Sequence, residues 1–534
     1  MQRLSSTQQA LDLILNQVNP CDSEGEDIDL QPDSDSEVSS DEETSSPPRK
    51  RSHLETHTGP TEKAKDGTVW RKEQVRRPLH HSTIQPYTAE GEPTALVRGT
   101  VSRRLQCFLC FINLGMLQTI QKWTVQHGQK QHYSWSMDLP ELMAFIAILL
   151  LQGVIKLPSP RDAWSATLGH PLINGIMAQN RFQDIMQHLR FDNMNTRSER
   201  VKTDRFAAIS DVWKSFVANC ISSYTPGRYI TIDQQLFPTK TRCSFLAYSA
   251  TKPDKFGIKF WVACDLKSKY VCNVIPDLGD DPSRPNVVMK LMEPFMNKGR
   301  TVTTDSFFTS LSLAQQLLSQ KTTLLGTVSK VCQELPESAK QNLDRHEFRT
   351  KVFSTSGTTL TVYAPKRKKT LCILSTMHSV VETGETRKKK PNTVNDYSRM
   401  KGGVDAMDQM VREYTVRSGT RRWPVAVFYN MVDIAALNAH ILYEACTGVK
   451  ERRIDFLMEL ASELAHSHVE AQKASVKTRL RQQPTTLEPG KRAKCQVKKK
   501  CNSNHATMRC ADCYRYTCGR CKEKVVWKCR DCAV

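Results

Sequence analysis

The sequence predicts a multidomain α+β protein, and three observations carry this prediction. With 534 residues the chain is too long for one hydrophobic core, so two to four domains are expected. Apolar residues recur at helical spacing from about residue 100 to 225 and again after residue 418, whereas the segment between them alternates like paired strands. A cysteine-rich tail follows the second helical segment.

The charge of the chain points to a polyanionic partner. The net charge is +21, but 11 acidic residues and no Lys or Arg lie between Asp22 and Glu43. Because Arg3 and Asp12 precede this tract, residues 47–534 hold 75 basic and 43 acidic side chains, an excess of 32. Such an excess favours nucleic acid as the partner. A merely well-solvated surface is the alternative, since net charge also serves solubility.

Residues 1–85 are predicted to be disordered, because acid runs, Ser and Pro leave few large apolar side chains to offset chain entropy. Within them, Arg49, Lys50 and Arg51 of "PPRKR" form a short basic cluster that predicts nuclear import and a nuclear protein. We expect no signal peptide and no membrane partner, since the most apolar stretch, 141–154, is too short to cross a bilayer.

The central segment predicts strands that end in aspartates. Residues 258–264 alternate as a strand that ends at Asp265, and residues 270–275 form its partner. A short strand then ends at Asp305 before a helix from about Ser310, and "TTLLGTVSK" and "TLTVYAPKRKKTLCILSTM" predict a further strand and a hairpin. The helix in "MKGGVDAMDQM" carries Asp405 and Asp408.

This order of strand-Asp, strand-Asp and helix-Asp is that of a ribonuclease H-like α/β core. Carboxylate oxygens hold Mg²⁺ while leaving positions open for substrate, and two such ions suit phosphodiester chemistry. Each acid also has a structural reading: Asp265 as a turn residue, Asp305 as a helix cap, and Asp405 as a favourable charge at a helix start.

Six ordered motifs resemble the core of the piggyBac transposases: "YTPGRYITIDQQLFPTKTRCSF", "KPDKFGIKFWVACD", "TTDSFFTSLSLAQQLL", "GTVSK", "KGGVDAMDQM" and "RRWPVAVFYNMVDIAALNAHILY". The similarity runs from about residue 100 to the C-terminus. It implies catalytic residues Asp265, Asp305, Asp405 and Asp408, with two Mg²⁺ ions held by the first three. It also implies a dimeric DNA transposase that nicks its element, forms a hairpin and joins at TTAA.

The resemblance also implies a domain plan. We expect a helical dimerisation and DNA-binding domain from residues 86–256 and 418–485. The ribonuclease H-like core would comprise 257–331 and 395–417, with an insertion domain at 332–394 and a zinc-binding domain at 491–534.

Four residues of "RSGTRRWP" are candidate DNA contacts: Arg417, Arg421, Arg422 and Trp423. Guanidinium groups pair with phosphates, and an indole stacks on an unpaired base. The alternative is that Trp423 packs in the helical core while the arginines are solvated.

The tail predicts two structural Zn²⁺ ions. Its eight cysteines are Cys495, Cys501, Cys510, Cys513, Cys518, Cys521, Cys529 and Cys532, and three Cys-x-x-Cys pairs strongly suggest zinc. We group Cys495 and Cys501 with Cys518 and Cys521, and the other four together, with His505 as a possible substitute for Cys495 or Cys501. The alternatives are a disulfide framework and a RING-like module; the positive charge of the tail favours DNA.

Two functions fit these features. The first is a nuclear transposase that acts on double-stranded DNA, and the second is a domesticated derivative that binds DNA or chromatin without moving it. Retention of the acidic residues favours the enzyme, because a pure binder has no chemical need for them.

Overall fold

The computed structural model describes residues 60–79, 84–157, 159–249, 254–279, 284–341, 347–366 and 369–482, and in the tail 493–497, 501, 506, 508–510 and 515–521. The chain divides into two compact units. The first comprises Met1–Glu92, Thr225–Gln235 and Lys259–Asp408, and the second Pro93–Tyr224, Leu236–Ile258 and Gln409–Val534.

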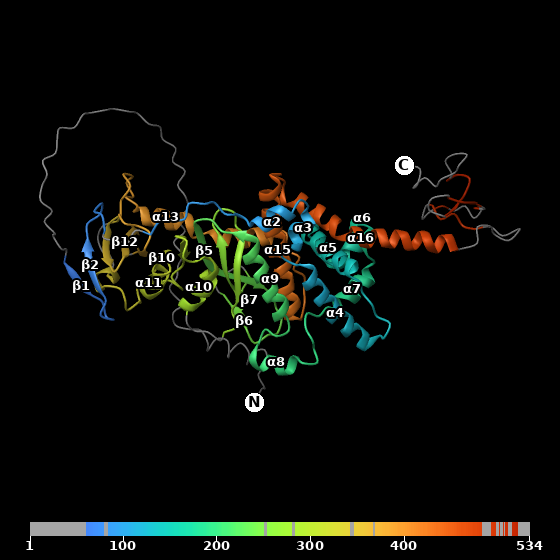
Figure 1. Ribbon diagram of the computed structural model, residues 1–534, viewed down its shortest axis with the longest axis horizontal. Helices are drawn as coiled ribbons and strands as arrows, with labels where there is room; N and C mark the ends of the chain where they lie inside the picture. The colour runs from blue at the N-terminus through green and yellow to red at the C-terminus, as the bar shows by residue number, and fades with distance from the viewer. Residues whose placement is uncertain are drawn as a thin grey trace, which may run out of the picture. The chain divides into compact units, whose positions relative to one another are not determined.

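A large sheet forms the first unit (Figure 1). Its strands run in the order β1-β2-β11-β12-β13-β10-β9-β5-β7, and β8 also pairs with β7. Strand β9 is parallel to both β10 and β5. The strands are β1 (Thr61–Lys63), β2 (Val69–Glu73), β5 (Tyr229–Pro238), β7 (Phe256–Asp265), β8 (Val271–Pro276), β9 (Thr301–Thr304), β10 (Thr323–Thr327), β11 (Thr350–Thr355), β12 (Thr358–Lys366) and β13 (Lys369–Ser375).

Helices pack on this sheet. Both α11 and α13 contact strands β10 and β13. Met400 and Tyr397 of α13 pack on Leu325, Tyr363 and Ile373 in a buried cluster. The helices are α10 (Arg284–Met292), η2 (Glu293–Phe295), α11 (Leu311–Ser319), α12 (Glu337–Lys340), α13 (Asn392–Met400) and α14 (Gly403–Glu413).

The predicted disorder of residues 1–85 is wrong for residues 60–79. Strand β2 pairs with β11, with Lys72 opposite Phe353, and the Trp70 side chain is fully buried. Its indole Nε1 donates a hydrogen bond to the carbonyl of Glu334 over 2.7 Å. A segment too polar to build its own core is ordered here because an existing sheet edge supplies hydrogen bonds and one apolar pocket. Residues 1–59, including Arg49, Lys50 and Arg51, lie outside the described residues.

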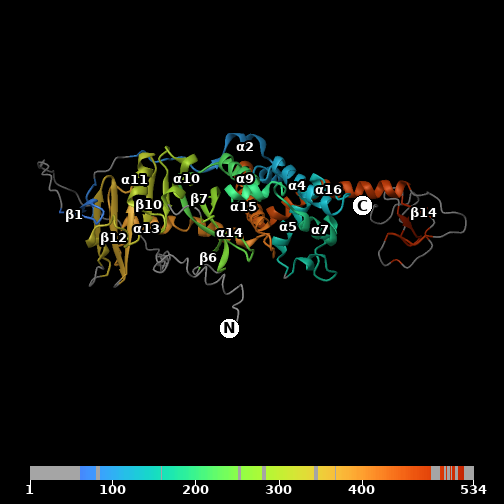
Figure 2. The same cartoon turned by 90° about the horizontal axis from the view of Figure 1, so that it is seen from below.

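The second unit is mainly helical. Helices α5 and α16 pack along each other, as both views show (Figures 1 and 2). Its helices are α2 (Ala95–Thr100), α3 (Arg104–Leu109), α4 (Leu114–Gln131), α5 (Leu139–Ile155), η1 (Pro160–Trp164), α6 (Pro171–Ile176), α7 (Gln179–His188), α8 (Arg197–Thr203), α9 (Ser210–Ser223), α15 (Trp423–Thr447) and α16 (Arg453–Gln482).

Short strands also occur. Strand β3 (Glu92–Pro93) pairs with β4 (Tyr224–Thr225), β6 (Leu246–Tyr248) pairs with the start of β7, and β14 (Met508–Arg509) pairs with β15 (Tyr516–Thr517) in the tail. Residues 86–256, expected to form the first part of a helical domain, also include strands β3, β4, β5 and β6 and the first residue of β7. Residues 332–394, expected as an insertion domain, extend the sheet of the first unit through β11, β12 and β13.

Helix α15 is long and apolar enough to span a membrane by length and composition alone. However, 94% of its most apolar window is buried inside the protein. Because nearly every side chain from Val425 to Tyr443 is buried, it has the character of a core helix.

Candidate active site

Two aspartates lie side by side on neighbouring parallel strands of the first unit. The register pairs Tyr229 with Thr301 and Thr231 with Thr303. Continued by two residues, it places Asp233 of β5 beside Asp305, which directly follows β9. Neighbouring strands are about 4.8 Å apart, and residues opposite each other point to the same face. The two carboxyl groups therefore share one side of the sheet.

Helix α14 lies against the same face of β5. The Thr231 hydroxyl donates a hydrogen bond to the carbonyl of Met400 over 2.9 Å, and a Cβ at Gly403 would lie 2.5 Å from Thr231 Oγ1. Four residues further along β5, the Gln235 amide donates a hydrogen bond to Asp408 Oδ1 over 3.2 Å. Because alternate strand residues share a face, Asp233 lies between these two contacts and faces the helix.

The helix brings two more carboxylates to this place. Asp405 and Asp408 are three residues apart on α14, so they lie on one side of the helix. Asp408 is buried against Gln235, whereas Asp405 is exposed and Asp233 and Asp305 are half-buried. The four acids thus range from the interior to solvent, as a site needs if it is to be both rigid and open to a large substrate.

The loop after Asp305 is held by its own contacts. The Asp305 carboxylate accepts a hydrogen bond from the backbone N–H of Phe307 over 3.0 Å, and its carbonyl accepts one from the Thr309 hydroxyl over 2.6 Å. The ring of Phe307 stacks on Trp261 of β7, with centroids 5.3 Å apart. These contacts fix the position of Asp305 at the strand end.

The donor set fits a hard divalent cation. Four carboxylates on two strands and one helix offer only oxygen ligands, the type that Mg²⁺ prefers. The neutral amide of Gln235 holds the carboxylate of Asp408 in place. Asp233, Asp305 and Asp405 would hold the metal, with Asp408 set beside them by Gln235.

Asp265, predicted to be a metal ligand, is a turn residue in this geometry. Its carboxylate is 1% exposed and accepts hydrogen bonds from Gly227 N (2.9 Å), Lys267 N (3.1 Å), and Ser268 N and Oγ (both 2.8 Å). Its oxygens are therefore already occupied by the turn that joins β7 to β8.

The position of Asp265 in the sheet also excludes it as a metal ligand of this site. The N–H of Leu266 donates a hydrogen bond to the carbonyl of Tyr229. Tyr229 is four residues before Asp233 on the same strand, a distance of about 13 Å. Moreover, Cys264 Sγ and Leu266 both approach Gly403, so Asp265 between them points to the opposite face. The prediction for Asp265 is corrected to Asp233.

Asp233 lies in "YTPGRYITID" but is not among the site residues that the sequence predicts. The alternation of Ile230 and Ile232 with polar residues is a strand signal. However, a helical domain is predicted over residues 86–256 and the first strand over 258–264, so no strand is expected at Asp233. Only the pairing of β5 with β9 identifies which strand-end aspartate faces Asp305.

The predicted DNA contacts of "RSGTRRWP" separate into different roles in the second unit. Arg422 donates to the carbonyls of Leu189 (2.8 Å) and Met186, so it caps the end of α7, and this corrects its assignment as a DNA contact. Trp423 is half-buried, with ring centroids 5.3 Å from Phe206 and 5.1 Å from Phe245. The alternative of a packed indole is therefore the one observed.

The two remaining arginines of this motif are exposed. Arg417 Nη1 donates to the carbonyl of Pro238 over 3.3 Å, which leaves most of its guanidinium at the surface. Arg421 is exposed, and within the described part of the chain no hydrogen bond or ion pair engages it. These two side chains stay candidates for phosphate contact.

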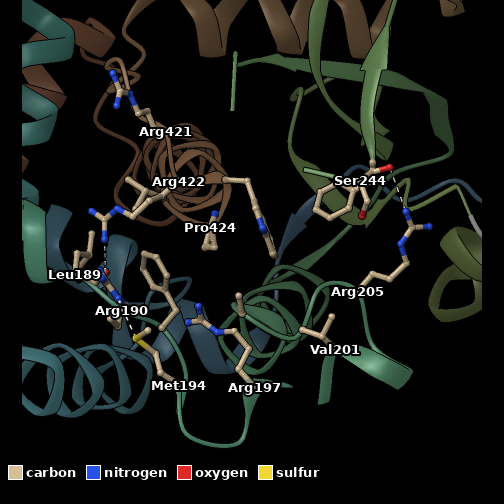
Figure 3. A pocket seen from close by; sticks show the side chains of 15 residues that line it. Leu189, Arg190, Met194, Arg197, Val201, Arg205, Ser244, Arg421, Arg422 and Pro424 are labelled. Carbon is tan, nitrogen blue, oxygen red and sulfur yellow. Dashed lines mark hydrogen bonds between the residues drawn. The ribbon is translucent and has the colours of Figure 1, made fainter. Parts of the chain in front are cut away.

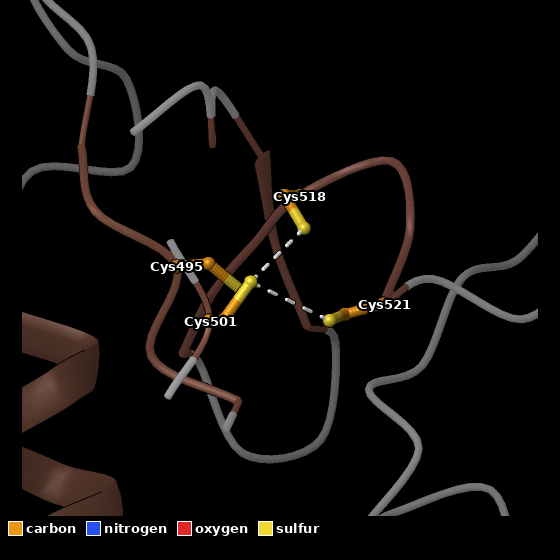
Figure 4. A group of neighbouring side chains, drawn as sticks. All are labelled: Cys495, Cys501, Cys518 and Cys521. Atoms are coloured by element: carbon orange, nitrogen blue, oxygen red, sulfur yellow. Dashed lines mark hydrogen bonds between the residues drawn. The ribbon is translucent and has the colours of Figure 1, made fainter. Parts of the chain in front are cut away.

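Four cysteines of the tail form a candidate zinc site (Figure 4). The sulfur atoms of Cys495, Cys501, Cys518 and Cys521 all lie within 4.8 Å of one another. Cys501 Sγ is 3.7 Å from Cys518 Sγ and 4.0 Å from Cys521 Sγ. A tetrahedral Zn²⁺ with Zn–S bonds of about 2.3 Å requires sulfurs about 3.8 Å apart, so the group fits zinc.

This group is the first of the two that the sequence predicts. Of the second, Cys510 is buried in the same small cluster as Tyr516 and Ala506. Cys513, Cys529, Cys532 and His505 lie outside the described residues. The second zinc site stays a prediction.

A Ser–His–Asp chain elsewhere in the first unit is structural. Ser375 Oγ lies 2.8 Å from His378 Nδ1, and His378 Nε2 lies 3.0 Å from Asp396 Oδ2. The Ser375 side chain is fully buried and accepts hydrogen bonds from the backbone N–H groups of Met377 and His378. A hydroxyl in this position cannot reach a substrate. The hydrogen bonds among these three side chains therefore anchor α13 to β13.

Comparisons with known proteins agree with this architecture. Human PiggyBac transposable element-derived protein 2 (Homo sapiens) is 22% identical over 423 residues, which are 73% of this chain and 68% of that protein. A cryo-EM structure of a piggyBac transposase synaptic complex with hairpin DNA is similar with a TM-score of 0.70 and 28% identity, over 83% of this chain and 100% of the other. The family described as Transposase IS4 matches residues 104–440, more than half of the chain. The chain therefore belongs to the piggyBac-type transposase family.

Proposed function

We propose that the chain is a metal-dependent DNA transposase whose ribonuclease H-like core cuts and joins phosphodiester bonds at Asp233, Asp305 and Asp405, with Asp408 beside them. The observation that carries the proposal is the convergence of these acids from β5, β9 and α14. Two Mg²⁺ ions, when bound, would polarise the scissile phosphate and lower the pKa of the attacking water.

The residues of the chain have separate tasks in this proposal. Asp233 lies on β5, and Asp305 directly follows β9, the neighbouring parallel strand. Asp405 and Asp408 come from the first turns of α14, and Gln235 orients Asp408. The close contact of Gly403 with Thr231 sets the distance between the helix and the strand. The same acids would serve nicking, hairpin formation and joining at TTAA, since each is a displacement at phosphorus.

The proposed partners follow from the family and from the charge. Double-stranded DNA is the substrate, and the excess of basic residues attracts it. The similar cryo-EM structure is a transposase synaptic complex with hairpin DNA, which supports DNA binding by this chain. We further propose a homodimer, nuclear localisation through Arg49, Lys50 and Arg51, and a tail with two structural Zn²⁺ ions that contacts the transposon ends.

A second candidate is a domesticated protein that binds DNA or chromatin without moving it. The name of the human relative, a transposable element-derived protein, favours this candidate. The retained Asp233, Asp305, Asp405 and Asp408 favour the enzyme.

A DNA cleavage assay with the purified full-length chain distinguishes the transposase from the domesticated DNA-binding protein. The substrate is a plasmid that carries the genomic sequence flanking the gene, incubated with Mg²⁺ or with Ca²⁺. The enzyme predicts nicks with Mg²⁺, which Asp233→Asn and Asp305→Asn each reduce at least about 100-fold because a metal ligand is lost. Binding of the same DNA should change little. Binding without cleavage by the unaltered chain would favour the domesticated protein.

A further inference from the structure

A threonine and a tyrosine form a pair beside Asp305 in the first unit. The parallel register of β9 and β10 pairs Thr304 with Gly326. Continued by one residue, it places Thr327, the last residue of β10, beside Asp305. Neighbouring strands are about 4.8 Å apart, and residues opposite each other point to the same face. Thr327 therefore extends the row of Asp233 and Asp305 by one strand, on the face of the sheet that carries the acids.

The hydroxyl of Tyr397 reaches Thr327 from helix α13. Tyr397 Oη lies 3.1 Å from Thr327 Oγ1, and either oxygen could be the donor. The tyrosine ring packs in a buried cluster with Leu325, Ile373 and Met400. Tyr397 is 6% exposed, whereas Thr327 is half-buried. The two hydroxyls therefore lie where the apolar core under α13 ends and the row of acids begins.

Contacts at both ends of α13 fix the position of Tyr397. The residue before it, Asp396, has its Oδ2 3.0 Å from His378 Nε2. The carbonyl of the last residue of α13 accepts a hydrogen bond from the Thr231 hydroxyl of β5 over 2.9 Å. Helix α14, which carries Asp405, begins after two further residues. Tyr397 is thus held against the same strands as the acids, next to the helix that brings two of them.

The hydroxyl pair supplies a hydrogen-bond donor, which the acids do not. Carboxylates that hold a metal ion are ionised, so they only accept hydrogen bonds. Two hydroxyls carry two protons and share one hydrogen bond, so the second proton can be directed to a further acceptor. When Thr327 donates to Tyr397 Oη, the phenolic O–H can donate to an anion held beside Asp305. Because this donor is neutral, it does not compete with Mg²⁺ for the carboxylates as a lysine would.

We infer that Tyr397 is a catalytic residue whose hydroxyl donates a hydrogen bond to a non-bridging oxygen of the phosphate that is cut, and that Thr327 is a positioning residue that orients this hydroxyl. A donor held in place at these oxygens stabilises the charge that they carry in the transition state of a phosphoryl displacement. The inference rests on the proposed function, because it takes the phosphate as lying at the metal ions held by Asp233, Asp305 and Asp405.

Tyr397→Phe tests the contact, because it removes the hydroxyl and keeps the ring. The full-length chain is given DNA that carries the genomic sequence flanking the gene. The rate of nicking at saturating DNA and Mg²⁺ should fall about 10- to 150-fold, the range for a hydrogen bond to a charged group. Affinity for this DNA in EDTA should be unchanged, since it depends on residues elsewhere. One of these is Arg421, a candidate phosphate contact that lines a pocket of the second unit (Figure 3).

Tyr363→Phe is the matched control. Tyr363 belongs to the same buried cluster, and its hydroxyl donates a hydrogen bond to the carbonyl of Lys388 over 2.7 Å. Its strand, β12, is separated from β9 by β13 and β10. Both variants remove one hydroxyl from the same cluster, so both should lose a similar amount of stability in urea unfolding. Only Tyr397→Phe should slow nicking.

Variants of Thr327 distinguish orientation of the tyrosine from packing. Thr327→Val keeps the branched shape but removes the hydroxyl, and it should slow nicking by a smaller factor than Tyr397→Phe. Thr327→Ser returns the hydroxyl and should recover the rate. A role in packing alone predicts the reverse order, because Ser lacks the methyl group that Val keeps.

A second measurement does not require cleavage. Ca²⁺ takes carboxylate ligands as Mg²⁺ does. The gain in DNA affinity when EDTA is replaced by Ca²⁺ therefore reports phosphate held at the acids. Tyr397→Phe should reduce this gain roughly fivefold, because one hydrogen bond to the phosphate is lost. Tyr363→Phe should leave the gain unchanged.

The outcomes separate this inference from the proposed function. If Tyr397→Phe equals Tyr363→Phe in nicking rate and in Ca²⁺ gain, the role of Tyr397 is overturned and the transposase stands. If the unaltered chain shows the Ca²⁺ gain but no nicking, the enzyme is refuted, and a smaller gain in Tyr397→Phe still supports the phosphate contact. If the unaltered chain shows no Ca²⁺ gain, the contact is overturned, because no phosphate then lies at the acids.

Discussion

The amide of Gln235 donates a hydrogen bond to Asp408 over 3.2 Å, and this bond joins strand β5 to helix α14. Asp233 lies two residues before Gln235 and Asp405 three residues before Asp408. The bond therefore fixes β5 and α14, which carry three of the four acids of the candidate site, relative to each other. The fourth acid, Asp305, follows β9, which pairs with β5.

Asp265→Asn should retain Mg²⁺-dependent cleavage but lower stability. An Asn side chain has one acceptor oxygen, so some of the donors at Gly227, Lys267 and Ser268 lose their partner. We expect a loss of about 1–3 kcal/mol in the free energy of unfolding, measured with urea. Asp233→Asn is the paired variant, with cleavage lost and stability little changed. The opposite pattern would restore Asp265 as the metal ligand.

Gly403→Ala should reduce both stability and cleavage. The added Cβ would lie 2.5 Å from Thr231 Oγ1, so α14 must move away from β5 and carry Asp405 with it. Overpacking of this kind costs about 1–3 kcal/mol. Gly402→Ala is the control, because nothing lies within 4 Å of a Cβ there. Equal behaviour of the two variants in urea unfolding and nicking would show that the helix position is not set by this contact.

Cys518→Ser should release one equivalent of zinc from the purified chain. Cys518 is one of four sulfurs that lie within 4.8 Å of one another, and a tetrahedral site rarely keeps its ion with three thiolates. Zinc content by elemental analysis should fall from two ions to one per chain. Cys110→Ser, whose sulfur bonds the carbonyl of Gln106 within a helix, should leave it unchanged. If Cys518→Ser still holds two zinc ions per chain, Cys518 is not a zinc ligand.

Stability should decrease as the pH rises from about 4 to 7 because of Asp433. Burial within α15 raises the pKa of its carboxyl to about 7, although Thr415 Oγ1 and Val416 N donate hydrogen bonds to it. Its pKa in the unfolded chain is about 3.9. Between these values the folded protein binds more protons than the unfolded chain, so the free energy of unfolding falls with rising pH.

Asp433→Asn removes this contribution of Asp433 to the pH dependence of the free energy of unfolding. The variant should gain stability relative to the unaltered chain between pH 5 and pH 8, by at most about 3 kcal/mol. Urea unfolding at the two pH values measures the difference. A constant difference at both would mean that Asp433 is ionised throughout.

The sequence by itself predicted those helices and strands whose buried face appears as a local pattern of apolar residues. Strands β7 and β8, the hairpin of β12 and β13, and helices α11 and α14 were predicted from alternation and helical spacing, because these patterns reflect which face of each element is buried. The spacing of the tail cysteines likewise predicted that Cys495, Cys501, Cys518 and Cys521 would gather. Asp305, Asp405 and Asp408 were identified as site residues from their places at a strand end and on a helix.

Only the tertiary structure shows which further aspartate lies in the candidate site with Asp305, Asp405 and Asp408. Asp233 and Asp265 both lie on strands and next to polar residues, so no local pattern distinguishes them. Only the parallel register of β5 with β9 places Asp233 beside Asp305, and only the turn at Gly227 and Ser268 occupies the carboxylate of Asp265. The same is true of Trp70, Arg422 and Trp423, whose roles depend on partners far away in the sequence. Strand pairing and long-range contacts are properties of the folded chain, and residue spacing does not encode them.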